Sequence, residues 1–489
     1  MIKKSDKMED GKDIADYAIE YGTSKGASYV EARFIDSWDE SYSARNGMFL
    51  GILENTRKGI AIRVIANGGM GFGSTEQLNK SSIEDLLNTI IRMAKASKRK
   101  EPIKFSEEEI VETNWKPEVR QNFIDISREE KKSYIKDLDK RLKSEANKKL
   151  KNRISFIQLY TDDKYIVTSE GSKVSSQNSL IVTMLMHTAR GKLGSEQKYF
   201  SLGGSAGWEW FKDIKFADLA VVAGKALVKT AQNAKGVKFD KPIDIVISGE
   251  VAGIMTHENV GHPSEGDRIL GREGAQAGES FYADLLKKEE LGKAKLGNEI
   301  VSVIDDPTIP ASAGFYLYDD ECVKARPRYL IKKGMLNDLL LNREYAARFN
   351  TKSTAAARAI TYQREPISRM ANTFFEPGDY SMEELIEGVK EGILMNSFTE
   401  WNIDDRRFQS KYVGLEVYLI KNGEITDTMV RRPILELTTY GILGSIDALG
   451  KDFFTPLGLC GKGDPMQGVP VSMGGPHARL RNISVGGGE

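Results

Sequence analysis

The sequence contains a short stretch, THENVGHPSEGD (residues 256–267), in which two histidines and a glutamate lie close together. Imidazole nitrogens are common ligands of transition metals, and a glutamate directly after the first histidine is typical of a helical zinc-binding motif, in which it activates water. That motif places its histidines four residues apart, whereas His257 and His262 are five residues apart. The residue types predict a hydrolytic metal centre, and the spacing requires an unusual backbone to bring both rings to one ion.

A regular α-helix cannot supply that backbone. Each residue turns about 100° around the axis, so side chains five residues apart point about 140° away from each other. One solution is a π-helical turn, which is frequent at functional sites. The other is a helix that unwinds after Val260, because Gly261 permits unusual dihedral angles and Pro263 disfavours the α conformation of the residue before it. We favour unwinding near Gly261.

A catalytic zinc ion usually has three protein ligands and one open coordination position, so a third ligand is required. Glu265 lies three residues after His262, and a carboxylate is a reasonable ligand. Cys460 lies in a glycine-rich segment, GLCGKGDPMQGVPV, and its thiolate would bind zinc tightly. A lone cysteine is more often a small buried side chain, so the residues alone leave both candidates open. Glu258, directly after the first histidine, is the expected general base.

Composition excludes several classes of protein. The 489 residues predict two or three domains. Lys+Arg and Asp+Glu number 70 each, without a basic block, so direct binding to nucleic acid is not expected. No apolar stretch is typical of a signal peptide or a membrane span. Two distant cysteines, Cys322 and Cys460, favour a reducing, cytoplasmic setting, and Cys322 receives no predicted role.

The chain reads as an α+β protein. In SYVEARF, Val30 and Phe34 alternate with Glu31 and Arg33, which predicts a half-buried strand. The glycines after Asn67 predict a hairpin turn and not a phosphate cradle, since no G-x-G-x-x-G pattern opens a helix. The segments ISFIQLYT and YIVTSEG, between residues 150 and 175, read as two separate strands.

A polar turn, NAKGVKFDKP, marks the main domain boundary. Residues 1–235 are predicted to form an N-terminal α/β domain with a mixed sheet and flanking helices, and the charged segment near 100–120 is a candidate division into two lobes. Residues 236–489 are predicted to form a β-rich domain that carries the H-E-x-x-x-H segment on a short helix.

Several motifs together resemble one family. HENVGHPSEGD is similar to the H-E-x-x-x-H…E-G-D signature of the TldD subfamily of the TldD/PmbA metalloproteases, and GLCGKGDPMQGVPVSMGGP resembles the C-terminal cysteine loop of the same family. SYSARNG, GIAIRVIANGGMGFGST, SLGG, DDE and PISRMANTF extend the resemblance over nearly the whole chain.

The resemblance implies a zinc centre formed by His257, His262 and Cys460, with Glu258 as general base and Glu265 shaping the site. It also implies a dimer around an internal chamber, either with a metal-less paralogue of the TldE/PmbA type or with a second copy. The implied substrates are unfolded or flexible peptides that add to a sheet edge. The alternative is a regulator of the gyrase-modulator type, which binds peptides or a partner without proteolysis. Pro263 and Cys322 depart from the family pattern.

Overall fold

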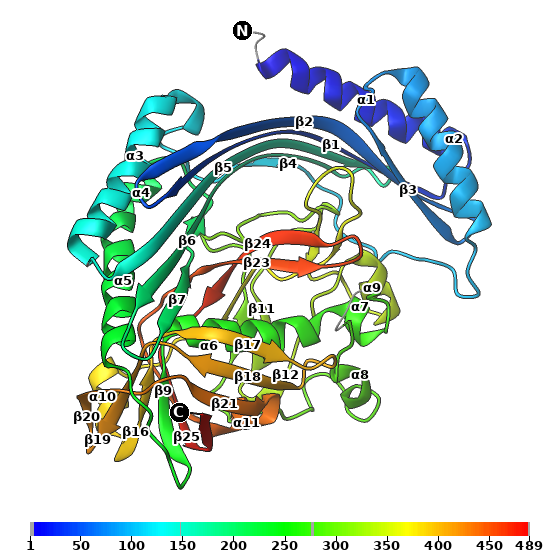
Figure 1. Cartoon of the computed structure of the whole chain (residues 1–489). Helices are drawn as coiled ribbons and strands as arrows, with labels where there is room; N and C mark the ends of the chain where they lie inside the picture. The colour runs from blue at the N-terminus through cyan, green and yellow to red at the C-terminus, as the bar shows by residue number, and fades with distance from the viewer. Residues whose placement is uncertain (1–3, 147, 275–277, 488–489) are drawn as a thin grey trace.

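The computed structural model describes residues 4–146, 148–274 and 278–487. It confirms the α+β class: a long, curved mixed sheet arches over several smaller sheets and helices (Figure 1). The division at residues 235 and 236 stays a prediction. The long sheet has the order β3-β2-β1-β5-β6-β4, with β7 and β8 also paired to β6. Its strands are β1 (Tyr29–Arg45), β2 (Met48–Ala66), β3 (Gly69–Thr75), β4 (Glu112–Trp115), β5 (Leu150–Thr168), β6 (Lys173–Arg190), β7 (Ser195–Phe200) and β8 (Gly203–Gly204).

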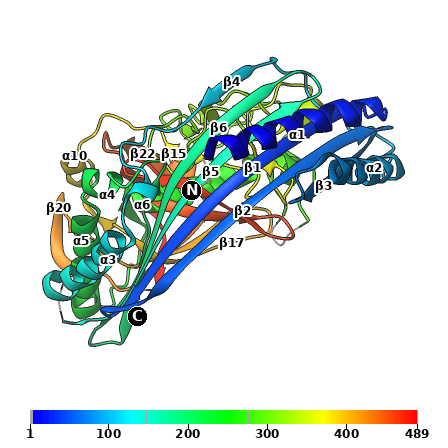
Figure 2. The same cartoon turned by 90° about the horizontal axis from the view of Figure 1, so that it is seen from above.

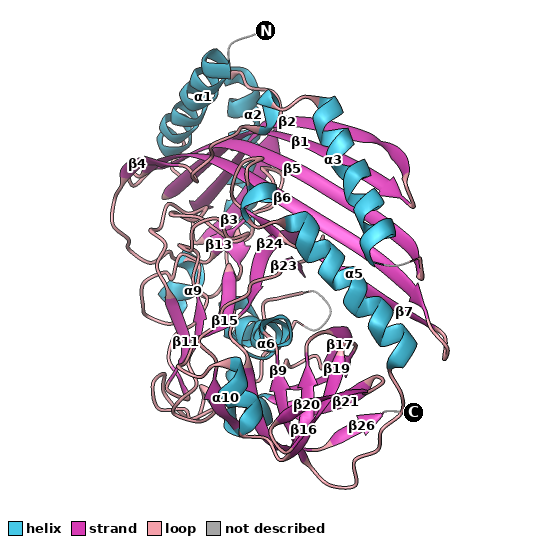
Figure 3. Ribbon diagram, turned by 90° about the vertical axis from the view of Figure 1, so that its left-hand side faces the viewer, coloured by secondary structure: helices cyan, strands magenta, loops and turns pink. Residues whose placement is uncertain are grey.

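Helices cover the outer face of this sheet at both ends (Figures 2 and 3). Val30 and Phe34 of β1 pack with the helices at one end, and Tyr42 of the same strand packs with those at the other end. Alternate residues of one strand therefore build both outer cores, as the period of two predicts. The helices are α1 (Lys4–Ser24) and α2 (Lys80–Ala96) at the first end, and α3 (Arg128–Arg141), α4 (Trp210–Asp213) and α5 (Phe216–Asn233) at the second.

The inner face of β1 is buried, so the prediction of a half-buried strand is wrong. Glu31 is 3% exposed and Arg33 is 1% exposed. Arg63 of β2 lies 2.7 Å from Glu31 and 2.8 Å from Glu321, which is far downstream in the sequence. Charged side chains can be buried when they are paired, and here the rest of the chain supplies the partner.

Two further predictions have different outcomes. The Asn67-Gly68 hairpin is confirmed, with positive φ angles of 53° and 75° between the paired strands β2 and β3. The two strands predicted between residues 150 and 175 are instead one strand, β5, for most of their length. The polar residues at 162–164 do not end it, because their backbones pair with β1 and β6 on both sides.

Below the arch, one six-stranded sheet has the order β12-β11-β10-β15-β24-β23, and another has the order β20-β19-β16-β9-β25-β22. A four-stranded sheet has the order β17-β18-β21-β26, and β13 pairs with β14. The strands are β9 (Ile243–Ile247), β10 (Val303–Asp305), β11 (Arg328–Lys332), β12 (Met335–Leu336), β13 (Ala357–Arg358), β14 (Ile367–Ser368), β15 (Asn372–Phe375), β16 (Glu391–Met395), β17 (Phe398–Ile403), β18 (Gln409–Gly414), β19 (Val417–Lys421), β20 (Glu424–Met429), β21 (Pro433–Thr438), β22 (Ile446–Leu449), β23 (Leu457–Lys462), β24 (Gln467–Gly474), β25 (Ala478–Ile483) and β26 (Val485–Gly487).

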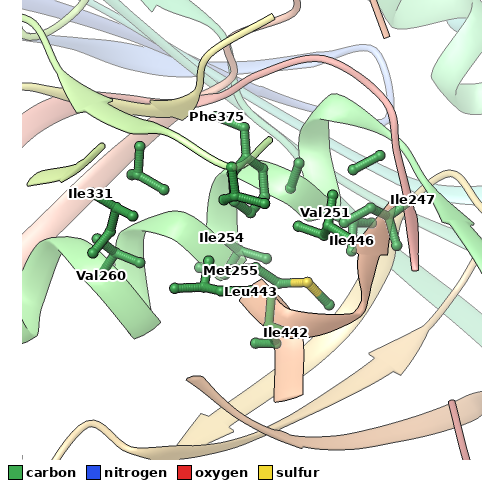
Figure 4. Packing of buried hydrophobic residues seen from close by; sticks show 14 of the residues in the cluster. Ile247, Val251, Ile254, Met255, Val260, Ile331, Phe375, Ile442, Leu443 and Ile446 are labelled. Carbon is green, nitrogen blue, oxygen red and sulfur yellow. The ribbon is translucent and has the colours of Figure 1, made fainter. Parts of the chain in front are cut away.

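Helix α6 (Gly249–Thr256) lies in the centre of this part of the chain and contacts β9, β15 and β24. Ser248 caps its first turn by accepting a hydrogen bond from the backbone N–H of Val251. Val251, Ile254 and Met255 pack into the surrounding apolar core (Figure 4). The helix is therefore fixed on all sides, which gives the residues that follow it a rigid base. The other helices are α7 (Gly266–Ile269), α8 (Tyr282–Leu285), α9 (Arg343–Arg348), α10 (Met382–Glu387) and α11 (Thr439–Ser445). Within the described ranges, every helix is too short or too polar to cross a membrane.

Candidate metal centre

The five-residue spacing is accommodated by a π-helical turn that directly continues α6. The turn covers His257–Gly261 and is followed by a 3-10 turn, His262–Ser264. The wider turn brings the two imidazoles together, with ring centroids 4.8 Å apart and ring planes at 79°. Both histidines are nearly fully buried, at 4% and 3% exposure.

The preference for unwinding near Gly261 is therefore wrong. Gly261 is helical, with φ −60° and ψ −60°, and His262 keeps the α conformation although a proline follows it. Pro263 is the second residue of the 3-10 turn that His262 begins, and proline is tolerated in the first turn of a helix, where its missing N–H costs little. The glycine serves packing instead, because a Cβ atom at this position would lie 1.9 Å from Sδ of Met370.

The structure brings His257, His262 and Cys460 together. One potential ligand atom from each residue lies within 4.8 Å of the others. Sγ of Cys460 is 3.5 Å from Nε2 of His262. Nδ1 of His257 is buried and has no hydrogen-bond partner among the described residues. Two imidazoles and a thiol around one point, with a buried nitrogen left unsatisfied, fit a transition-metal ion of the zinc type.

Cys460 is held in the form that binds metal. Burial opposes ionisation, but His262, His257 and Arg369 bring the pKa of its thiol well below the ordinary value. The backbone carbonyl of Cys460 also accepts a hydrogen bond from Arg369, which fixes β23 beside the π-helical turn. The thiolate is the form of cysteine that coordinates metals.

Glu265 lies behind His262. Its Oε2 atom is 3.0 Å from Nδ1 of His262, and it also receives Nε of Arg268 at 2.7 Å and Nζ of Lys462 at 3.3 Å. Burial opposes its ionisation, yet Lys462, His262 and Arg268 hold the pKa of this carboxyl well below its usual range. An ionised Glu265 makes Nδ1 the donor and leaves Nε2 of His262 directed at Cys460. This is the orienting role that carboxylates have behind metal-bound histidines.

We expect Glu265→Gln to bind metal 10–100-fold more weakly than the parent, because a neutral amide holds the imidazole of His262 less strongly than a carboxylate and leaves the charges of Arg268 and Lys462 unbalanced. Competition with a chromophoric chelator measures the affinity. Glu344→Gln is the matched control, since Glu344 is 6% exposed and paired with Arg272 outside the centre. Unchanged affinity in Glu265→Gln would contradict the orienting role.

Glu258 lies at the edge of the cluster and is held by two side chains. Its Oε1 accepts a hydrogen bond from Nε1 of Trp401 at 3.2 Å, and its Oε2 accepts one from Nη1 of Arg407 at 2.6 Å. Trp401 lies on β17, and Arg407 lies in the connection to β18 with a φ of 60°. The β17–β18 hairpin therefore positions the carboxylate from a segment about 150 residues away.

The same hairpin also fixes the π-helical turn. Oδ1 of Asn259 accepts hydrogen bonds from Oη of Tyr412 at 2.5 Å and Oγ of Ser410 at 3.0 Å, both on β18. Its amide nitrogen is 3.3 Å from Oγ1 of Thr439. The widened turn is thus tied to neighbouring structure at its middle residue.

The cluster opens into a cleft of about 540 Å³. Residues of β7 in the long sheet, of β17 and of β23 line it, and Figure 1 shows where these strands lie. Both β17 and β23 are terminal strands in the described sheets. Besides the cluster and Glu258, the lining includes Tyr199, Phe200, Leu202, Phe398, Trp401, Arg407, Leu457 and Leu459. Each of these two strands therefore has one edge without a sheet partner among the described residues.

Cys322 lies outside the centre. It packs with Ile166 and Val174 under the long sheet, and its Sγ atom is 3.9 Å from the carbonyl of Ile166. Burial, together with nearby carboxylates, raises the pKa of its thiol well above the ordinary value. It is a protonated packing residue.

Three supporting residues, Trp401, Arg407 and Lys462, were not predicted. Trp401 and Arg407 follow a strand pattern with no chemical motif around them. Lys462 could have been predicted from the sequence, because it lies two residues after Cys460 and alternate residues of a strand point to the same face. A fully buried lysine is rare without carboxylate partners, and here Asp267 lies 2.6 Å away.

A buried set of two imidazoles and a thiol beside a carboxylate, on this α+β fold, defines the class of a metal-dependent hydrolase. Three family models match consecutive parts of the chain. They describe PmbA/TldA metallopeptidase domain 1 at residues 30–97, the central domain at residues 121–234 and the C-terminal domain at residues 240–487. The chain belongs to the PmbA/TldD metallopeptidase family, which confirms the resemblance drawn from its motifs.

Relatives agree with this assignment. A metalloprotease of Methanocaldococcus jannaschii is 32% identical over 488 residues, which is 98% of each chain. The zinc metalloprotease TldD homolog of Saccharolobus solfataricus is 28% identical over 437 residues, covering 88% of this chain and 90% of the relative. The protein is a metallopeptidase.

Solved structures share the fold. TldE from Thermococcus kodakarensis superposes with a TM-score of 0.76 at 16% identity, covering 97% of this chain and 100% of that chain. A putative modulator of a DNA gyrase from Thermotoga maritima gives a TM-score of 0.77 at 16% identity, with the same coverage. At this identity the likeness establishes the architecture.

Proposed function

We propose that this chain is a zinc-dependent peptidase that hydrolyses unfolded or flexible peptides. The observation that carries the proposal is the convergence of His257, His262 and Cys460 beside Glu258 in an open cleft. Three donors correspond to a catalytic site with one open coordination position, whereas structural zinc sites usually have four protein ligands.

His257, His262 and Cys460 would hold the zinc ion. When bound, zinc supplies a Lewis acid that polarises a carbonyl and lowers the pKa of water to about 7. Glu258, which lines the same cleft, would accept a proton from the attacking water and later deliver it to the leaving amine. Trp401 and Arg407 hold its two oxygens, so the carboxylate is oriented before a substrate arrives.

Extended peptides are supported as substrates because β17 and β23, which line the cleft, each end the strand order of their sheets. A peptide that adds to a strand edge is recognised through its backbone, so many sequences are accepted. Folded proteins do not offer such a free backbone. We also propose a dimer that encloses the cleft, formed with a metal-less paralogue of the TldE/PmbA type or with a second copy.

Metal analysis of the purified protein, with and without its paralogue, tests the proposal together with digestion of an unstructured peptide. We expect about one zinc ion per chain and peptide hydrolysis that disappears on chelation and returns with zinc. A protein that binds zinc tightly in all preparations without cleaving any unfolded peptide would contradict the enzymatic proposal. Hydrolysis that survives complete removal of metal would contradict the metal centre.

The alternative, a gyrase-modulator type of binding protein, makes the opposite prediction for chelation. Its peptide or partner binding should persist without metal in a folded chain. Circular dichroism on the metal-free protein separates loss of binding from loss of structure.

A further inference from the structure

A second cavity, of about 550 Å³, lies beside the metal-centre cleft. Its upper wall is the inner face of the long sheet, and its lower wall includes the β23–β24 hairpin, which lies under the arch in Figure 1. Leu459 of β23 lines both cavities and is 53% exposed. A peptide bound along β23 at the metal centre would therefore extend directly into the second cavity.

Charges of both signs line this cavity, and some of them are already paired. Nζ of Lys164 lies 2.6 Å from Asp320, and Nη1 of Arg57 lies 3.4 Å from Asp39. The charges within each pair neutralise one another. Two arginines and two carboxyl groups of the lining remain to be considered.

The two arginines are Arg358 and Arg364. The guanidinium of Arg358 donates hydrogen bonds to the carbonyls of Met370 at 2.8 Å and Pro470 at 2.9 Å. Arg364 lines the cavity and is half-buried. Neither guanidinium forms an ion pair with any carboxylate in the part of the chain that the structure describes.

The two carboxyl groups are poor counter-charges. Asp319 uses both oxygens to accept hydrogen bonds from three backbone N–H groups, and burial together with Glu321 raises its pKa well above the ordinary value. Asp162 accepts one hydrogen bond, from Oη of Tyr160 at 3.1 Å, and burial raises its pKa. The hydrogen bonds of Asp319 and Asp162 go to other groups, so Arg358 and Arg364 are the two guanidinium groups of the lining that are placed to bind an added anion.

We propose that this second cavity binds the carboxylate of a peptide whose backbone extends past Leu459 from the metal centre, with Arg364 as the main contact. This inference rests on the proposed peptidase function and specifies its substrate. Guanidinium groups recognise carboxylates through paired hydrogen bonds, which are strongest where water is limited. The carboxylate can be the chain terminus or an aspartate or glutamate side chain, since the chemistry is the same. Arg358 also braces two carbonyls, so Arg364 is the residue to test.

The test measures binding by fluorescence anisotropy in the full-length, metal-loaded Glu258→Gln protein. Three labelled peptides are derived from one unstructured sequence without acidic residues. The first has a free C-terminal carboxylate and the second has a C-terminal amide. The third has the C-terminal amide and an aspartate in place of one residue. We expect Arg364→Gln to lower the affinity for a carboxylate-bearing peptide about tenfold. The affinity for the amidated peptide without aspartate should change by no more than about twofold.

The pattern among the peptides identifies the source. If Arg364→Gln loses affinity for the peptide with the free C-terminus, the cavity binds a terminal carboxylate. If it loses affinity for the aspartate peptide, the cavity binds a side-chain carboxylate. Arg364→Lys should retain part of the preference for carboxylate-bearing peptides over the amidated peptide, because lysine keeps the positive charge. Arg92→Gln, at an exposed position on α2, is the matched control.

An equal loss for all three peptides, or no loss for any of them, would overturn the carboxylate site. Thermal melting of Arg364→Gln separates a folding defect from a binding defect. Binding is measured without turnover, so failure of this inference is distinguishable from failure of the peptidase proposal, which digestion by the parental enzyme reports.

Discussion

The Glu258→Gln enzyme is expected to retain its metal and to lose peptide hydrolysis by a factor of about 10²–10⁴, the usual contribution of a positioned general base. The amide keeps the shape of the carboxylate and one oxygen that can accept from Trp401 or Arg407, so the fold should be undisturbed. It cannot take a proton from water. Single-turnover cleavage of an unstructured peptide, together with metal content, measures both properties.

The control is Glu400→Gln, which removes an exposed carboxylate from the same hairpin, where Glu400 accepts a hydrogen bond from Asn402. It should cleave at the parental rate. Parental hydrolysis by Glu258→Gln would reject Glu258 as the base. Loss of metal in that variant would show that the carboxylate supports the centre structurally.

Cys460→Ser is expected to lose metal more severely than Glu265→Gln, beyond the 10–100-fold typical of a residue that only orients a ligand. A serine hydroxyl stays protonated near neutral pH, whereas the thiol of Cys460 is held in its ionised form by His262, His257 and Arg369. Metal content after dialysis and chelator competition measure the loss, and peptide hydrolysis should fall with metal occupancy.

The chain supplies a matched control in its other cysteine. Cys322→Ser removes an equally buried thiol far from the cluster, so it should change stability without changing metal content. If Cys460→Ser binds metal as tightly as the parent, the third ligand lies elsewhere, and Glu265 becomes the first candidate.

The candidate ligands were predictable because chemistry restricts them to few residue types. Only four histidines occur in the chain, and two of them flank a glutamate within the same short stretch. The choice between Glu265 and Cys460 needed the family resemblance. In the structure Cys460 lies in the cluster with the histidines, whereas Glu265 contacts the outer nitrogen of His262.

The backbone at the centre was predicted incorrectly for a physical reason. Local preferences at Gly261 and Pro263 favour the end of a helix, but tertiary contacts decide the conformation. Asn259 is held by β18, and Met370 fills the space where a larger residue than glycine would project. Neither neighbour is visible from the local sequence.

For the long sheet, the burial of the outer face could be predicted from the sequence, whereas the burial of the inner face could not. Apolar residues alternate as expected on the side covered by helices. The inner side carries charges that read as solvent-exposed, yet Arg63 finds Glu321 more than 250 residues away. Partners so distant in the chain, and the second cavity under the long sheet, emerge only from the folded arrangement.

The π-helical turn bears on how this centre relates to metallopeptidases with the shorter H-E-x-x-H spacing. Removing one residue between His257 and His262 would give that spacing, at which an ordinary helix already places both side chains about 40° apart. The additional residue is therefore not needed for the two histidines to meet. In a regular helix it would rotate everything downstream by about 100° around the axis, and the wider π-helical turn absorbs that rotation, so His262 still lies beside His257. The consequence is that a one-residue difference in spacing need not change the metal-binding geometry, since the wider turn keeps the histidine pair together and the chain continues through the 3-10 turn to the buried charges of Glu265 and Arg268.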